Sequence, residues 1–185
     1  MVYVAVACQT ALLVVFGVSS ATKLRGREAY RAFRDSLRAL RWLPQTLVAP
    51  AAALTVVAEV ATVLLLVVPA WRALGFAAAA ALLTVFSAGI AAARRRGASA
   101  PCRCFGRSTR PLGWAHVARN AALLAVAGTG RLALVAADPG APLHPGGVAV
   151  AVAAGVAVGG LSAIFDEIVE LFAPTPLDRS RATAR

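Results

Sequence analysis

Five apolar stretches, each about as long as a lipid bilayer is thick, constrain the fold of this chain more than any other feature. A helix needs about 20 mostly apolar residues to cross the roughly 30 Å hydrocarbon layer. The stretches cover residues 2–21, 47–68, 71–93, 115–137 and 146–165. The alternating pattern of outer-membrane barrel strands is absent. The sequence therefore predicts an all-α fold: a polytopic transmembrane helical bundle.

Two of the stretches are weaker than the others, so we predict four to five spans. Stretch 115–137 is interrupted by Arg119 and Arg131, and stretch 146–165 is rich in glycine, alanine and valine. Four spans plus a peripheral helix is the alternative. Stretch 2–21 lacks the basic start and the A-x-A cleavage pattern of a signal peptide, which predicts a retained first helix.

Composition and charge distribution favour a lipid bilayer as partner and argue against nucleic acid. A hydrophobic content of 59% is too high for a soluble domain of this size. The net charge is +11, but the basic residues are confined to gaps between the apolar stretches. The gaps at 22–46 and 94–114 are rich in arginine, whereas 138–147 has no lysine or arginine. The positive-inside rule thus predicts a multi-pass inner or plasma membrane protein with its N-terminus outside.

The first basic gap carries an amphipathic pattern over residues 28–43. Tyr30, Phe33, Leu37 and Leu40 recur at helical spacing, with arginines on the other faces. This pattern predicts an interfacial helix in the headgroup layer that braces the first and second spans. A docking surface for an acidic partner is the alternative.

Two of the three cysteines, Cys102 and Cys104, are one residue apart in the second basic gap. They belong to the motif Cys-Arg-Cys-Phe-Gly-Arg at residues 102–107. Thiol–disulfide exchange needs a thiolate, and the neighbouring cations of Arg103 and Arg107 favour one. The pair therefore predicts a redox couple, which the charge rule places at the cytoplasmic face.

Metal binding and a purely structural role are the alternatives for these cysteines. His116 is the nearest further ligand, but structural zinc takes four ligands and a full set is not visible. We therefore expect neither a metal nor a cofactor. The alternative function is a non-catalytic membrane scaffold or assembly factor whose cysteines are structural or bind metal.

Glu59 is the one acidic residue within the apolar stretches, about midway along 47–68. Ionisable groups at such depth are costly and generally have a partner. The candidate partners are Lys23 (the only lysine), Arg119 and Asn120. The pattern indicates an ion pair between helices or a proton path.

The order of these motifs resembles the MauE branch of the MauE/DoxX-like membrane proteins. The resemblance covers about residues 1–135. It is carried by Phe-Gly-Val-Ser-Ser-Ala-Thr-Lys-Leu at residues 16–24, Glu59, Cys-x-Cys-Phe-Gly at 102–106, Trp114, Arg119 and Asn120.

The resemblance implies a redox-associated membrane protein that supports thiol exchange or maturation of partner proteins, methylamine dehydrogenase in the case of the named member. It also implies a thioredoxin-like or thiol-bearing client as partner. Cys102 and Cys104 would react, and the supporting residues would be Lys23, Glu59, Arg103, Phe105, Gly106, Arg107, Trp114, Arg119 and Asn120. Arg103 departs from the small residue expected between the cysteines. Methylamine itself is not implied, because many relatives have no link to it.

We expect a membrane domain over 1–137, an outer loop and fifth helix over 138–173, and a disordered basic tail over 174–185.

Overall fold

The computed structural model describes residues 1–39, 44–95, 114–138 and 143–171, and within these ranges the chain is helical with no strand. The prediction of an all-α helical bundle is confirmed. The elements in chain order are α1 (Val2–Leu24), α2 (Arg27–Ala39), α3 (Gln45–Val67), the 3₁₀ turn η1 (Pro69–Trp71), α4 (Arg72–Arg95), α5 (Trp114–Val135) and α6 (Pro145–Leu171).

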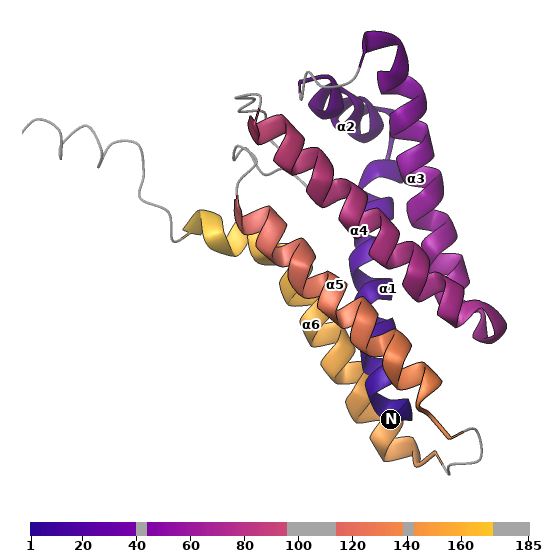
Figure 1. Ribbon diagram of the computed structural model, residues 1–185. Coiled ribbons are helices and arrows are strands. Elements are labelled where there is room, and N and C mark those ends of the chain that lie inside the picture. The colour runs from indigo at the N-terminus through magenta and orange to yellow at the C-terminus, as the bar shows by residue number, and fades with distance from the viewer. Residues whose placement is uncertain (40–43, 96–113, 139–142, 172–185) are drawn as a thin grey trace, which may run out of the picture.

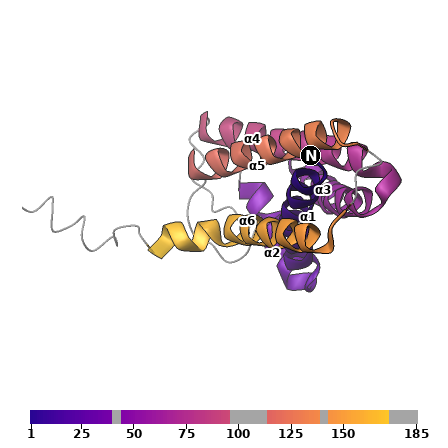
Figure 2. The same ribbon diagram turned by 90° about the horizontal axis from the view of Figure 1, so that it is seen from below.

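Helix α1 is the centre of the bundle. It packs against α3, α5 and α6, while α4 packs against α3 and α5 (Figure 1). Viewed from below, α1 lies between α4 and α5 on one side and α6 on the other (Figure 2). Three of the other long helices therefore pack directly on α1.

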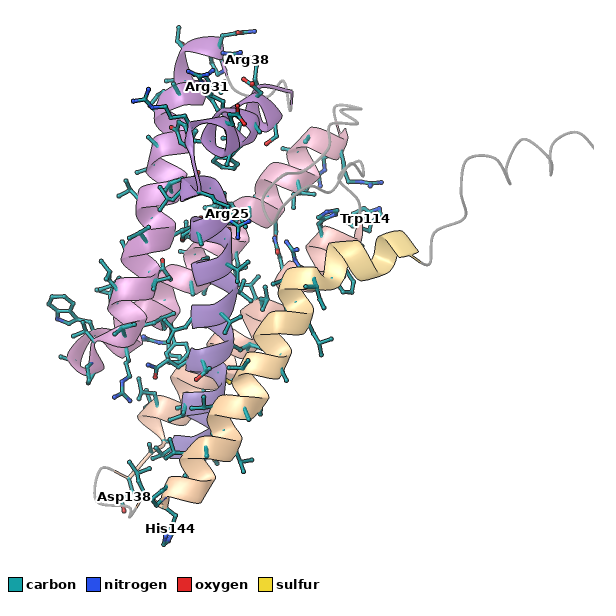
Figure 3. The ribbon with its side chains drawn as sticks, turned by 180° about the vertical axis from the view of Figure 1, so that it is seen from behind. Arg25, Arg31, Arg38, Trp114, Asp138 and His144 are labelled. Atoms are coloured by element: carbon teal, nitrogen blue, oxygen red, sulfur yellow. The ribbon has the colours of Figure 1, made fainter. Side chains whose placement is uncertain are left out.

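The two ends of the bundle differ in charge (Figure 3). Arg25, Arg31 and Arg38 lie at one end, called the Arg-rich end below, and Asp138 and His144 lie at the other. Helix α1 ends at the Arg-rich end, where α2 follows it and α3 and α5 begin (Figure 1). The segregation of arginine that the sequence predicted is thus a property of the folded molecule.

Four helices in the described part of the chain are long and apolar enough to cross a membrane: Val2–Leu24, Gln45–Val67, Pro69–Arg95 and Pro145–Phe165. Helix α5 is not among them, because polar residues, among them His116, Arg119, Asn120 and Arg131, lower its hydropathy. It still runs the length of the bundle, since α4 ends at the Arg-rich end and α6 begins at the other (Figure 1). Of the two weaker stretches, 115–137 is therefore the one that is not apolar enough to count as a span. Helix α6 packs along α1 rather than lying apart from the bundle.

The apolar core lies where α1, α3, α4 and α5 meet, and its largest residues are Leu12, Phe16, Leu66, Phe76, Leu83 and Leu123. Large apolar side chains also cover the outside, among them Leu54, Leu74, Val85, Leu132 and Leu161. An apolar exterior suits helices whose solvent is lipid, where association depends on close packing rather than on burial from water.

Glycines permit that close packing between α1 and α6. A Cβ atom added to Gly155 would lie 2.5 Å from the carbonyl oxygen of Ala7, and one added to Gly159 would lie 2.7 Å from that of Ala11. Small residues four apart are a common device for close approach of membrane helices. The two glycines therefore allow the α6 backbone to rest on that of α1.

Candidate functional site

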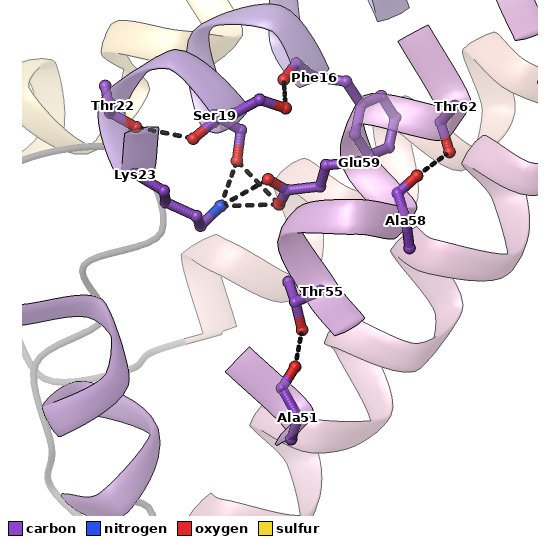
Figure 4. Close-up of polar contacts among 10 residues, drawn as sticks. Phe16, Ser19, Thr22, Lys23, Ala51, Thr55, Ala58, Glu59 and Thr62 are labelled. Carbon is purple, nitrogen blue, oxygen red and sulfur yellow. Dashed lines mark hydrogen bonds and ion pairs between the residues drawn. The ribbon is translucent and has the colours of Figure 1, made fainter. Parts of the chain in front are cut away.

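A buried ion pair joins the end of α1 to the middle of α3. The Lys23 Nζ atom lies 2.7 Å from Oε1 and 2.9 Å from Oε2 of Glu59 (Figure 4). Ser19 lies between them: its Oγ accepts from Lys23 Nζ at 2.6 Å and donates to Glu59 Oε1 at 3.0 Å. Lys23 is 2% exposed and Glu59 0%. Of the partners proposed for Glu59 from the sequence, Lys23 thus forms the ion pair.

Helical geometry explains how α1 supplies two members of this site. Ser19 and Lys23 are four residues apart, which places them on one face of a helix. The helix continues to Leu24, three residues past the predicted end at residue 21, so that Lys23 remains on this face. The hydroxyl of Ser20 is satisfied locally, because it donates to the carbonyl oxygen of Phe16 at 2.7 Å.

Helix α2 covers the lysine. The Phe33 ring centroid lies 4.9 Å from Lys23 Nζ, a distance typical of a cation–π contact. Phe33 is buried together with Ala52 and Val56 of α3, and Tyr30 packs beside them. The ammonium of Lys23 is therefore surrounded by a carboxylate, a hydroxyl and an aromatic face.

The amphipathic helix is confirmed, and its described part runs from Arg27 to Ala39. Its apolar face lies on the protein itself, against α3, instead of being free to enter the headgroup layer. The predicted brace between the first two spans is thus formed by direct packing of side chains.

A second group of buried polar residues lies in the first turns of α5. His116, Arg119 and Asn120 are all buried, and Asn120 Nδ2 donates to Ser87 Oγ of α4 at 3.4 Å. Such residues in a membrane helix typically face the bundle interior. They explain why α5 is less apolar than its neighbours, and they lie on the face that packs into the bundle.

The predicted reactive segment lies outside the described residues, including Cys102, Arg103, Cys104, Phe105, Gly106 and Arg107. Its flanks are described. The Arg94 guanidinium lies 5.2 Å from the ring centroid of Trp114, which brings the end of α4 against the start of α5. Trp114 is 68% exposed and lies towards the Arg-rich end (Figure 3). The chain therefore leaves and re-enters the described bundle at adjoining points.

The remaining cysteine, Cys8, lies in the first half of α1. It is half-buried, and its Cβ would be 2.7 Å from a Cβ atom added to Gly130 of α5. Gly130 thus makes room for Cys8 where α1 and α5 cross. This position is within the apolar core, beside Phe76.

Sequence reasoning missed two partners of Lys23 in the buried site, Ser19 and Phe33. The signal for Ser19 was its position one turn before the lysine in an apolar helix. The spacing of α2 placed Phe33 on the apolar face, but nothing in the sequence identified what that face would cover.

The comparisons with known proteins give one match, to a family model. No curated protein and no solved structure matches the chain. The sequence model of the family described as methylamine utilisation protein MauE matches residues 1–133, which include α1 to α4 and nearly all of α5. Helix α6 lies beyond the match. The chain is therefore a multi-pass membrane protein that belongs to the MauE family.

Proposed function

We propose that this membrane protein supports thiol–disulfide exchange, or the maturation of partner proteins by such exchange, through Cys102 and Cys104. The observation that carries the proposal is two cysteines one residue apart in an arginine-rich segment of a MauE-family protein. The segment joins two helix ends that lie side by side at Arg94 and Trp114. Closely spaced thiols in a cationic setting suit reversible disulfide formation.

The exchange conserves atoms and electrons without any further cofactor. The thiolate of one cysteine attacks a disulfide of the partner, forms a mixed disulfide and releases one partner thiolate. The second cysteine, after losing its proton, attacks the mixed disulfide and releases the other partner thiolate. Cys102 and Cys104 are then oxidised to a disulfide and the partner is reduced by two electrons. The reverse sequence oxidises a partner, so the client is a thiol-bearing or thioredoxin-like protein.

The buried ion pair supports this activity as a structural element. Lys23 and Glu59 join α1 to α3, and α1 also contacts α5, the helix that follows the reactive segment. Arg119 and Asn120 anchor the start of α5 within the bundle. In this proposal these residues fix the positions of the helices that support the reactive segment, and the cysteines perform the chemistry.

Trapping the thiols in intact cells tests the proposal. In a Cys8→Ser background only Cys102 and Cys104 remain. Under oxidising conditions we expect both to be protected from alkylation, and reductant to restore labelling of both. The Cys102→Ser and Cys104→Ser single variants are the matched controls, because the lone thiol left in each cannot form the internal disulfide. Full labelling of the pair under oxidising conditions would contradict the redox role.

The same variants test the side of the membrane. The excess of arginine at one end favours a cytoplasmic position for that end, with the N-terminus outside. A membrane-impermeant maleimide should therefore not label the reduced pair in whole cells, but should label it in inverted vesicles. Labelling in whole cells would place the pair outside.

A non-catalytic scaffold or assembly factor is the second candidate, favoured by the close packing of α1 with α3 and α6. It predicts that the double Cys102→Ser/Cys104→Ser variant leaves the thiol state of client proteins unchanged. The exchange proposal predicts that clients accumulate in the wrong oxidation state.

A further inference from the structure

Four arginines of α2 form a single stripe. Arg27, Arg31, Arg34 and Arg38 are spaced four, three and four residues apart. At about 100° per residue, this spacing places all four within about 60° of one another around the helix. Arg31 and Arg38 lie at the Arg-rich end of the bundle (Figure 3). We call these four residues the arginine stripe.

The orientation of the stripe is fixed by the packing of the apolar side of α2. Phe33 is 2% exposed against Ala52 and Val56, with Tyr30 and Leu37 packed around this cluster. The arginines are left on the outer side, where Arg38 is 47% exposed and Arg34 34%. The packing of α2 therefore holds the stripe on the outside of the protein, since turning the arginines inward would expose Phe33 and uncover Lys23.

Carboxylates neutralise the stripe only in part. Asp35 Oδ1 lies 3.5 Å from Arg38 Nη1 and 3.8 Å from Arg34 Nη2, and Glu28 is the other acidic residue of the helix. Four arginines against two carboxylates leave a positive surface. Exposed ion pairs of this kind contribute little and can exchange partners.

The stripe lies at the ends of membrane-spanning helices. Helix α1 ends at Leu24, which is exposed, and α3 begins at Gln45; both helices are candidate membrane spans, and α2 lies between them in the chain. The stripe therefore lies where the apolar surface of the bundle gives way to charge. Phospholipid phosphates occupy that level of a bilayer, and guanidinium groups bind phosphate through paired hydrogen bonds.

We propose that the arginine stripe binds the phosphate groups of anionic phospholipids. The occupant is a lipid, because the stripe lies at the ends of two membrane-spanning helices, the level at which phospholipid headgroups meet a membrane protein. Basic residues at an anionic membrane surface each contribute about 1 kcal/mol. Lipid bound at the stripe would hold α2 in place over Lys23. It would thereby keep the buried Lys23–Glu59 ion pair covered.

Titration of the detergent-solubilised, full-length protein with anionic phosphatidylglycerol tests the proposal, with zwitterionic phosphatidylcholine as reference. Lipid retention is read by native mass spectrometry and the midpoint of thermal unfolding by circular dichroism. The wild-type protein should retain phosphatidylglycerol preferentially and unfold at a higher temperature with it. The Arg31→Gln/Arg38→Gln variant should bind it about 30-fold more weakly, since two contacts of about 1 kcal/mol are lost.

Two further variants separate the stripe from net charge. Arg179→Gln/Arg181→Gln removes the same charge elsewhere in the chain and should bind as the wild type does. Asp35→Asn removes a competing carboxylate from the stripe and should bind more tightly. Because Asp35 is exposed, this variant keeps the proposal testable if the double variant on α2 folds poorly.

Three results would overturn the proposal. The first is unchanged binding of phosphatidylglycerol by both α2 variants. The second is displacement of the lipid by millimolar glycerol phosphate, which would assign the stripe to free phosphate. The third is displacement by a polyglutamate peptide that also protects the stripe in lipid-free protein, which would assign it to an acidic protein partner.

Discussion

Replacing Glu59 with alanine is expected to lower the free energy of unfolding by about 3–5 kcal/mol, because the ammonium of Lys23 would remain buried without its counter-charge. Lys23 is enclosed by Glu59, Ser19 and Phe33, so water has little access to it. A serine hydroxyl and an aromatic face are weaker partners for a cation than a carboxylate. The measurement is reversible unfolding of the purified protein in mixed micelles, followed by circular dichroism.

A double replacement distinguishes loss of the pair from loss of packing. Lys23→Met combined with Glu59→Leu removes both charges and keeps most of the apolar volume, so it should recover most of the lost stability. Glu28→Ala is the matched control, since Glu28 is an exposed carboxylate of α2 and its loss should change stability by less than about 0.5 kcal/mol. A Glu59→Ala protein as stable as Glu28→Ala would show that the pair contributes nothing.

The transmembrane architecture could be predicted from the sequence because a bilayer imposes one dominant constraint. Backbone polar groups have no water to bond in hydrocarbon, so each apolar stretch has to form a helix of bilayer length. The observed spans follow the predicted ones within a few residues, as in α3, predicted over 47–68 and found at Gln45–Val67. Hydropathy alone was sufficient to predict the bounds of these helices.

The buried pair could be predicted only as a set of alternatives. A carboxylate within an apolar span requires a partner. Hydropathy does not give the rotation of each helix about its own axis, however, so Lys23, Arg119 and Asn120 were equivalent as candidates. The rotation is fixed by packing: α1 turns Ser19 and Lys23 towards α3, and α5 turns Asn120 towards Ser87 of α4.

The glycines of α6 and the cover over Lys23 could not be predicted for the same reason. Both depend on which helix surfaces meet. From the sequence, the glycines only made 146–165 a weaker apolar stretch. The predicted reactive segment differs, because its chemistry comes from the spacing of Cys102 and Cys104 rather than from the packing of helices. Its role in exchange stays a prediction for the alkylation experiment.

The contact of α6 with α1 gives the second large effect, and adjacent glycines provide its control. A Cβ atom at Gly159 would lie 2.7 Å from the carbonyl oxygen of Ala11 and 2.8 Å from Cβ of Val14, whereas one at Gly160 would meet no atom within 4 Å. Gly159→Ala should therefore force the backbones of α6 and α1 apart and cost about 1–3 kcal/mol. Gly160→Ala should gain up to about 1 kcal/mol, because alanine favours a helix more than glycine does.

The two variants share the same change in helix propensity, so the difference between their unfolding free energies isolates the helix contact. Gly155→Ala should resemble Gly159→Ala, since its added Cβ would lie 2.5 Å from the carbonyl oxygen of Ala7. Combining Gly155→Ala with Gly159→Ala should detach α6 along two turns and expose Thr10 and Val14 of α1. Equal stabilities of the Gly159→Ala and Gly160→Ala proteins would contradict direct backbone contact and indicate that α6 rests on α1 only through its side chains.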